Sequence, residues 1–409
     1  MKNCTRDKVL LSGFIPPDHL NRKAMQEYKD CGFNLCYMTE NHYKVDSPEY
    51  FESLKLMEEL GLEACVAFYK VQTGKYHEHF KNVDLHDYPA VTMIHAIDEP
   101  DDDLIRKVSE IYVPWFNEHY SDIDFFMNTF GGCGTEVSKL DKFNDHINKC
   151  ITSINDKVTA KNKFFSIDAY PLRTKGYWEN FLEASAYIRG LAAGAKRVKE
   201  TDSIFGGCIQ TYAGYMNCRY PNSEADIRFQ NFCQFAFGAR SLCYFTYMSE
   251  ETPMYLFRGM VTAKGELTPL YHIVKNINAE INTFEKDYMH FDWLGTTVVD
   301  GCKVNDYAED FAFVRNDIGL DYKDDNVLEV SAERDLLLGC FGDDDNKRAY
   351  VITTFAEPSK GLDNKVSITF KNGKKAKINF NGKDEVRDLV DGKLELNMKD
   401  GDGAFVIIE

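Results

Sequence analysis

The sequence predicts an α/β protein built as a (β/α)₈ barrel followed by a C-terminal antiparallel β-sandwich. Eight short β-type apolar runs alternate with amphipathic helical runs in its first two-thirds, which is typical of a parallel α/β fold. Beyond that, short alternating strands separated by Gly, Asp and Asn turns take over. The 409 residues suit a barrel of roughly 250 residues plus a partner domain. We therefore divide the chain into a barrel, 1–285, and a sandwich, 286–409.

The eight barrel strands are expected where β-branched and aromatic residues gather between turn residues. They are predicted at 9–15, 33–38, 63–69, 91–97, 122–130, 164–170, 203–212 and 241–248. Between them, helical patterns repeat at three- and four-residue steps, as in 47–60, where Gly61 offers a C-cap. A doubly wound open sheet is the alternative, but no GxGxxG follows the first strand to support it.

The last predicted helix, 268–287, closes the barrel, and the rest of the chain is typical of a sandwich. Its strand-like segments alternate apolar and polar residues and are expected at 311–317, 348–355, 365–380 and 394–409.

Composition excludes several classes of partner and site. With 48 Lys+Arg against 65 Asp+Glu, the net charge is −17, which argues against nucleic acid or an anionic membrane as partner. No apolar stretch approaches a transmembrane helix and the start lacks a signal core, so we expect a cytoplasmic protein unless a signal peptide has been removed. The 12 cysteines lie mostly in apolar runs without metal-ligand spacing, so we expect buried reduced thiols, no metal and no cofactor.

The carboxyl ends of the predicted strands single out the segment Asp98-Glu99-Pro100. In a (β/α)₈ barrel the active site lies at these ends. Two adjacent carboxylates leaving an apolar strand have no packing role, and capping of the next helix can fall to the acidic residues 101–103. Repulsion and partial burial should raise the pKa of one carboxyl group, giving a proton donor at neutral pH.

The barrel order, the segments YPAVTMIHAIDEP and DAYP, and the C-terminal sandwich together resemble the clan of (β/α)₈ glycoside hydrolases. Members of that clan place the acid/base glutamate at the end of strand four, and the resemblance assigns that role to Glu99. They also place a nucleophilic glutamate at the end of strand seven, where this sequence has Gln210. An amide cannot attack an anomeric carbon, so the usual two-carboxylate mechanism lacks its nucleophile.

A substrate-assisted mechanism needs no protein nucleophile, because the 2-acetamido oxygen of the sugar attacks instead. The Asp-Glu pair resembles that of β-N-acetylhexosaminidases, especially β-N-acetylgalactosaminidases. This resemblance implies that Asp98 orients the acetamido group and Glu99 protonates the leaving oxygen. Tyr170 or Tyr247 would donate to the acetamido oxygen and Gln210 to a sugar hydroxyl. The leading prediction is an exo-acting retaining β-N-acetylhexosaminidase whose partner is a carbohydrate.

Two alternatives remain open. Asp168, at the end of strand six, is either a sugar ligand or the nucleophile of a β-galactosidase-like enzyme with Glu99 as the acid. Alternatively, the barrel binds carbohydrate without catalysis and Gln210 records a lost nucleophile. Asn128 fits a sugar hydroxyl ligand or a buried structural amide, and His95 is by default a core histidine.

Other residues near the strand ends carry weaker signals. Glu40, Glu250 and Glu251 are typical of solvated loops. Sugar rings stack on aromatic faces, although most aromatic residues in such a barrel fill the core. The possible platforms are Trp115, Trp178, Tyr212, Tyr215 and Tyr255.

Overall fold

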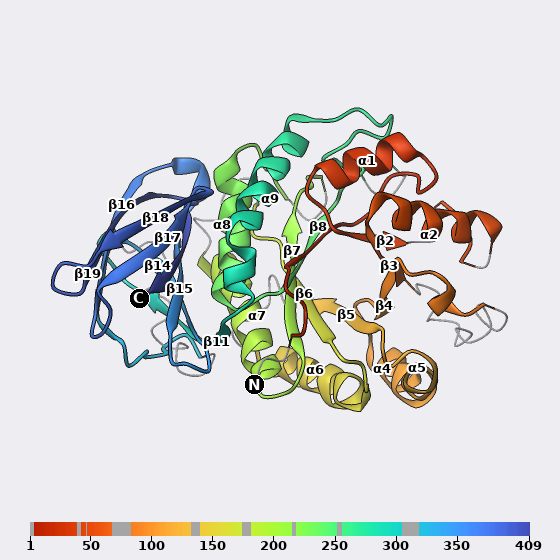
Figure 1. Ribbon diagram of the computed structural model, residues 1–409, viewed down its shortest axis with the longest axis horizontal. Helices are drawn as coiled ribbons and strands as arrows, with labels where there is room; N and C mark the ends of the chain where they lie inside the picture. Colours follow the sequence, from red (N-terminus) through yellow and green to blue (C-terminus); the bar gives the residue numbers. More distant parts are fainter. Residues whose placement is uncertain are drawn as a thin grey trace.

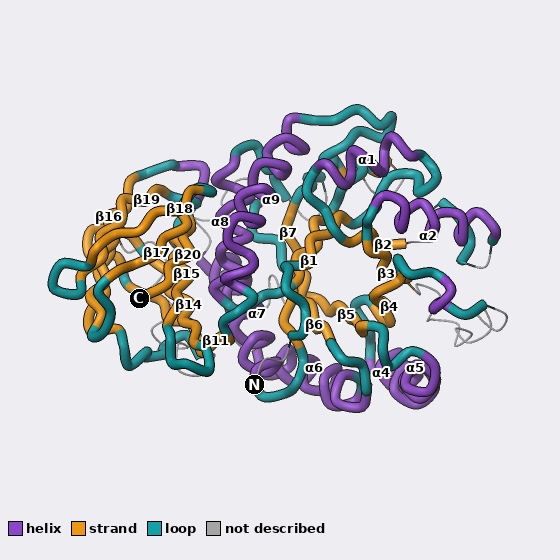
Figure 2. The backbone as a smooth tube through the Cα atoms, viewed as in Figure 1, coloured by secondary structure: helices purple, strands orange, loops and turns teal. Residues whose placement is uncertain are grey.

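Eight parallel strands close into a barrel in which the first strand pairs with the last (Figures 1 and 2). The computed structural model describes residues 4–38, 42–45, 47–67, 83–131, 140–173, 181–214, 218–251, 256–304 and 319–409. The strands are β1 (Leu10–Gly13), β2 (Leu35–Met38), β3 (Glu63–Ala67), β4 (Val91–Ile97), β5 (Asp124–Phe130), β6 (Lys163–Asp168), β7 (Ile204–Gln210) and β8 (Ser241–Phe245). The predicted barrel is thus confirmed, and closure excludes the open doubly wound sheet.

The predicted strand ranges overlap all eight observed strands, and the predicted 91–97 coincides with β4. The prediction for the first strand ran too far, because β1 ends at Gly13 and Ile15 adopts a φ of 54°. A β-branched residue rarely takes this left-handed conformation, and it ends the extended backbone. The last barrel strand also ends earlier than expected, at Phe245.

Helices surround the barrel and begin and end at the expected signals. In α2, Ser47 accepts a hydrogen bond from the Tyr50 N–H at the start, and Gly61 takes the left-handed conformation at the end. The helices are α1 (Arg22–Asp30), α2 (Pro48–Leu60), α4 (Asp102–Lys107), α5 (Val113–His119), α6 (Leu140–Ser153), α7 (Phe181–Lys199), α8 (Glu224–Ala236) and α9 (Pro269–Tyr288), with a π-helical turn at Val108–Tyr112 between α4 and α5. None of these helices combines the length and the apolar composition needed to span a bilayer.

The C-terminal part is made of two sheets, as predicted. The larger has the order β11 (Asp292–Val299), β14 (Leu336–Gly342), β15 (Arg348–Thr354), β20 (Gly403–Ile408), β17 (Lys375–Phe380) and β18 (Lys383–Asp388). The smaller has the order β12 (Gly301–Val304), β13 (Val327–Arg334), β16 (Asp363–Phe370) and β19 (Lys393–Lys399). All pairings are antiparallel except β12 with β13. The predicted strand at 311–317 lies outside the described residues.

Strands β14, β15 and β20 of the larger sheet are buried on both faces, because the outer face of the sheet packs against α8 and α9 (Figure 1). Along β20, Ala404 and Val406 enter the core between the two sheets, whereas Phe405 and Ile407 belong to the barrel core. The Phe405 ring lies 5.6 Å from that of Phe284 in α9. This double burial explains why β14, β15 and β20 are nearly continuous apolar runs.

Removing the Phe405 side chain should destabilise the whole protein. Phe405→Ala leaves a cavity between sheet and helix, and we expect a loss of about 3–5 kcal/mol in the free energy of unfolding. Denaturant titration followed by circular dichroism measures this loss. The matched control is Val386→Ala on β18, where the side chain is 60% exposed and the expected change is within about 0.5 kcal/mol. Equal effects of the two variants would contradict a shared core.

Candidate active site

A cavity of about 500 Å³ opens at the carboxyl end of the barrel. It brings together five of the seven residues predicted for the site, namely Asp98, Glu99, Asn128, Asp168 and Tyr170. Its remaining lining residues are Phe14, Tyr37, His95, Phe126, Phe130, Gly131, Arg173, Cys208, Tyr212, Cys243, Phe245 and Phe257. The rule that strand ends meet at one face of a barrel therefore predicts that these five side chains share a cavity.

An irregular end of β4 delivers both Asp98 and Glu99 to the cavity. The register between β4 and β5 shifts between His95 and Ile97, and Glu99 adopts a φ of 41°. A non-glycine residue in this left-handed region stores strain, which persists only when its surroundings enforce it. Here the Glu99 N–H donates to the carbonyl of Asn128 at 3.1 Å. Asp101 caps α4 by accepting from the Leu104 N–H, so neither carboxylate of the pair is needed as a cap.

Asn128 fixes the Asp98 carboxylate. Its Nδ2 donates to Oδ1 of Asp98 at 2.9 Å, and the Asn128 residue is 7% exposed. The Oδ1 atom of Asn128 has no hydrogen-bond partner among the described residues. A buried amide oxygen in a cavity wall normally finds a donor, and a ligand hydroxyl or amide group would supply one.

Asp168 and Glu99 are joined by a hydrogen bond between their side chains. Burial raises the pKa of Asp168 well above its usual range, and the charges of Glu99 and Asp98 raise it further, against the opposing hydrogen bond from the Gly131 backbone. Two carboxyl groups in contact can share one proton, and burial favours the protonated form of Asp168. The sequence analysis predicted a raised pKa for one member of the Asp98-Glu99 pair, but the raised pKa is that of Asp168.

His95 is buried like a core histidine, yet it also lines the cavity. Burial lowers its pKa although the charge of Asp98 opposes the shift, so the ring is neutral at neutral pH. Its Nε2–H donates to the Ile97 carbonyl at 2.9 Å. His95 therefore adds no positive charge beside Asp98.

Aromatic rings form a continuous belt around the cavity. The Tyr212 and Phe245 centroids are 5.2 Å apart, those of Tyr170 and Tyr212 also 5.2 Å, and those of Phe245 and Phe14 5.4 Å. Phe257 continues the belt at 5.5 Å from Phe245. Such rings present apolar faces on which the C–H faces of sugars stack. Burial raises the pKa of Tyr170 well above its usual range, so its hydroxyl remains a hydrogen-bond donor at neutral pH.

Of the aromatic platforms considered from sequence, Tyr212 lines the cavity and Trp115 does not. Trp115 lies on α5, stacked on His119 at 5.6 Å. Three others, Trp178, Tyr215 and Tyr255, lie outside the described residues, as does Glu40. Glu250 forms a two-residue strand, β9 (Glu250–Glu251), which pairs with β10 (Leu256–Phe257) and does not line the cavity.

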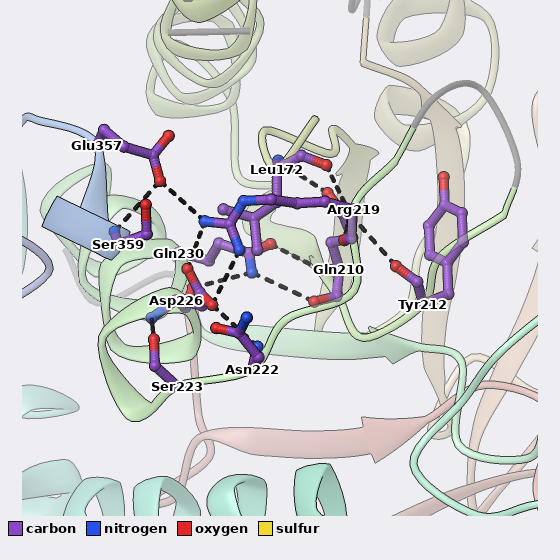
Figure 3. Close-up of polar contacts among 10 residues, drawn as sticks. All are labelled: Leu172, Gln210, Tyr212, Arg219, Asn222, Ser223, Asp226, Gln230, Glu357 and Ser359. Atoms are coloured by element: carbon purple, nitrogen blue, oxygen red, sulfur yellow. Dashed lines mark hydrogen bonds and ion pairs between the residues drawn. The ribbon is translucent and has the colours of Figure 1, made fainter. Parts of the chain in front are cut away.

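Gln210 was predicted to bind a sugar hydroxyl, but it does not line the cavity and is fully buried. Figure 3 shows its contacts with the backbone. Its Oε1 accepts from the Leu172 N–H at 2.9 Å, and its Nε2 donates to the carbonyls of Leu172 at 2.8 Å and Arg219 at 2.9 Å. The backbone of two loops thus occupies both ends of the amide. We therefore do not assign Gln210 to substrate binding.

Tyr247 was the second candidate donor to an acetamido oxygen, and it too does not line the cavity. Its ring is 1% exposed and packs 4.9 Å from Tyr28 of α1 and 6.4 Å from Tyr271 of α9. It lies between the barrel and its helices. Tyr170 is the one of the two candidate tyrosines that lines the cavity.

Arg173 is a cavity residue that the sequence analysis missed. It follows the DAYP segment by two positions, and its Nη1 donates to Sγ of Cys218 at 3.3 Å. Arg173 is neither a carboxylate, an amide nor an aromatic residue, and only these types were considered at the strand ends. A basic residue just beyond a strand-end carboxylate was the available signal.

Known proteins resemble this chain in fold and not in sequence. No family model and no curated protein matches the chain. A catalytic mutant of a GH42 β-galactosidase from G. stearothermophilus is 10% identical, with a TM-score of 0.50 over 100% of this chain and 99% of that chain. A β-galactosidase from the psychrophilic Marinomonas ef1 is 11% identical, with a TM-score of 0.46 over 69% of this chain and 62% of that one. An endo-β1,6-glucanase is 9% identical, with a TM-score of 0.45 over 99% and 92%. The chain shares the (β/α)₈ barrel fold.

Proposed function

We propose that this protein is an exo-acting retaining β-N-acetylhexosaminidase that uses substrate-assisted catalysis, with N-acetylgalactosamine favoured by the sequence resemblance. The observation that carries the proposal is the placement of Asp98 and Glu99 side by side in one aromatic-lined cavity. Gln210 stands where the clan has its nucleophile, and its side chain is hydrogen-bonded to backbone groups. A mechanism without a protein nucleophile accounts for both facts.

In this mechanism the 2-acetamido oxygen attacks the anomeric carbon while the bond to the leaving oxygen breaks. Asp98, held by Asn128, accepts the acetamido N–H and so increases the electron density on the attacking oxygen. Glu99 donates a proton to the leaving oxygen. Water, deprotonated by Glu99, then attacks the anomeric carbon and reopens the oxazoline ring, giving net retention. Tyr170, which lines the same cavity, donates to the acetamido oxygen in this mechanism.

Asp168 supplies the proton that Glu99 delivers. Because the two carboxyl groups are hydrogen-bonded and the pKa of Asp168 is raised, the pair holds one proton at neutral pH. The shared proton moves from Asp168 across this hydrogen bond to Glu99 and on to the leaving oxygen, which leaves both carboxyl groups ionised. Glu99 then takes a proton from the attacking water, and this restores the shared proton to the pair.

The two-carboxylate alternative asks Asp168 to be an ionised nucleophile. Retaining enzymes of that type keep their carboxyl groups about 5 Å apart, so that the sugar fits between them. Here Asp168 is hydrogen-bonded to Glu99, and burial favours its neutral form, which is a poor nucleophile. The non-catalytic alternative assigns no role to a pair that holds a proton.

Aryl β-glycosides with and without a 2-acetamido group test the mechanism. We expect release of nitrophenol from 2-acetamido-2-deoxy-β-glycosides and inhibition by a thiazoline analogue of the oxazoline. Equal turnover of an aryl β-galactoside would refute substrate assistance, and covalent trapping of a 2-fluoro sugar on Asp168 would establish the two-carboxylate mechanism. Sugar binding without turnover of any aryl glycoside would support the non-catalytic barrel.

Substituting either member of the strand-four pair should abolish most of the turnover. Glu99→Gln removes the proton donor and Asp98→Asn removes the acceptor of the acetamido N–H, each costing roughly 10²–10⁴-fold in kcat. Steady-state kinetics on the 2-acetamido substrate measures this loss. Asp101→Asn, which alters the helix cap next to the pair, is the control and should leave kcat within about twofold. Loss of turnover in the control alone would contradict the assignment.

The pH dependence of the Asp168→Asn variant distinguishes two possible roles of Asp168, as a proton supply for Glu99 and as a nucleophile. The variant cannot hold the shared proton, so we expect its rate profile to fall off at lower pH than that of the wild type. It should also be more stable near neutral pH. Below about pH 4 Asp168 is protonated in both folded and unfolded chains. As pH rises, the unfolded chain ionises first, because the folded pKa is raised, and this favours unfolding.

Thermal melts at several pH values measure this second effect. The Tm advantage of Asp168→Asn over the wild type should grow from pH 4 toward neutral, by a few degrees for each kcal/mol. Asp388→Asn, whose side chain is 82% exposed, provides the control without such a trend. A Tm difference independent of pH would show that Asp168 does not retain its proton on folding.

A further inference from the structure

A chain of hydrogen bonds connects the sandwich to one wall of the cavity (Figure 3). It begins at Glu357, which lies in the sandwich after β15 and is 9% exposed. Oε1 of Glu357 accepts from Nη2 of Arg219 at 2.9 Å and from the Ser359 N–H at 3.2 Å. The sandwich thus contacts the loop that joins β7 to α8.

Arg219 is shared between the sandwich and the barrel. Its two terminal nitrogens donate to the two carboxylate oxygens of Asp226 in α8, at 3.0 and 2.5 Å, and Asp226 is fully buried. Burial alone would lower the pKa of Arg219, but the hydrogen bond and charge of Asp226, followed by those of Glu357, raise it. The guanidinium therefore stays charged, and two carboxylates orient it.

The backbone of Arg219 continues the chain inward. Its carbonyl accepts from Nε2 of Gln210, and its N–H donates to the Leu172 carbonyl at 3.0 Å. Gln210 also binds both the N–H and the carbonyl of Leu172. The side chain of Gln210 pairs with the Leu172 backbone much as a neighbouring strand would. The loops after β6 and β7 are thereby joined.

The joined loops carry three lining residues, Tyr170, Arg173 and Tyr212. Leu172 lies between the first two, and the carbonyl of Tyr212 is 3.3 Å from Nε2 of Gln210. Arg173 forms an isolated β-bridge with Cys218, whose Sγ donates to the Tyr212 hydroxyl at 3.1 Å. One side of the cavity is therefore set by the two loops that Gln210 and Arg219 hold.

We propose that Glu357, Arg219 and Gln210 are positioning residues, through which the sandwich sets the substrate-contacting wall formed by Tyr170, Arg173 and Tyr212. The inference rests on the proposed function only in taking this cavity as the substrate site. It assigns the sandwich a part in substrate binding without any contact between sandwich and sugar. Gln210 then serves neither as a nucleophile nor as a sugar ligand, and it acts by holding the wall instead.

Glu357 is the residue at which to test the proposal, because its loss leaves Arg219 paired with Asp226. Hydrogen–deuterium exchange on the substrate-free protein measures directly how well the backbone amides of the wall are protected. In Glu357→Ala we expect amides in 170–173 and 211–214 to exchange about tenfold faster than in the wild type, and amides in 403–408 of β20 to be unchanged. Glu357→Gln should restore near wild-type exchange, because its amide oxygen accepts the same two hydrogen bonds.

Glu333→Ala is the matched control, since it removes an ion pair with Lys303 that lies within the sandwich. It should leave exchange in 170–173 and 211–214 unaltered. With a turned-over aryl 2-acetamido glycoside, Glu357→Ala should raise KM about tenfold, with kcat within about twofold and the pH profile unmoved. A merely structural loss would lower the active fraction and not alter KM.

The possible outcomes separate this proposal from the proposed function. Unchanged wall exchange in Glu357→Ala overturns the positioning role, as does equal acceleration in Glu333→Ala. Faster wall exchange with unchanged KM also overturns it. Faster, Gln-rescued wall exchange in a protein whose wild type hydrolyses no aryl glycoside supports the link between sandwich and wall while refuting the hydrolase.

Discussion

The hydrogen bond between Asp168 and Glu99 is the interaction on which the site depends. Three carboxyl groups line one cavity together with a belt of aromatic rings, and burial of that kind strongly disfavours more than a few negative charges. Burial and the neighbouring carboxylates favour the neutral form of Asp168, which lowers the negative charge, and the Asn128 amide donates a hydrogen bond to Asp98. The cavity can therefore hold three carboxyl groups with less negative charge than their number implies.

The barrel must place the ends of three successive strands in register to make this arrangement. Asp98 and Glu99 follow β4, Asn128 lies in β5, and Asp168 ends β6. The left-handed φ of Glu99 and the register shift before it turn two consecutive residues into the same cavity, which an ordinary strand, alternating its side chains, cannot do. The Asn128 backbone holds that strained residue, while its side chain holds Asp98. One residue of β5 thus fixes both members of the pair.

Sequence reasoning succeeded where the fold itself dictates proximity and failed where loops decide. Because all strand ends of a parallel barrel meet, Asp98, Glu99, Asn128, Asp168 and Tyr170 could be brought together from their positions alone. Gln210 lies two residues after the cavity residue Cys208, so strand alternation predicts that its side chain also faces the cavity. Hydrogen bonds to the backbone of two irregular loops hold its amide away from the cavity instead. Tyr247 lies past Phe245, the last residue of β8, where alternation no longer predicts direction. The raised pKa of Asp168 required knowing its contact with Glu99, which no spacing shows.

The sandwich is attached to the barrel in a way that suits a role in the site. Its larger sheet buries one face against the helices, so Phe405 and its neighbours belong to the barrel core. Because this attachment is rigid, the Glu357 side chain keeps a fixed position relative to the ends of the barrel strands. A flexible linker between the two parts would not fix that position. A half-buried guanidinium between two buried carboxylates is costly unless every partner is present, and this makes the arrangement of Asp226, Arg219 and Glu357 sensitive to position. The cavity wall is consequently coupled to the packing of the sheet on α8, and residues remote from the carboxyl groups share in shaping the space that a substrate would fill.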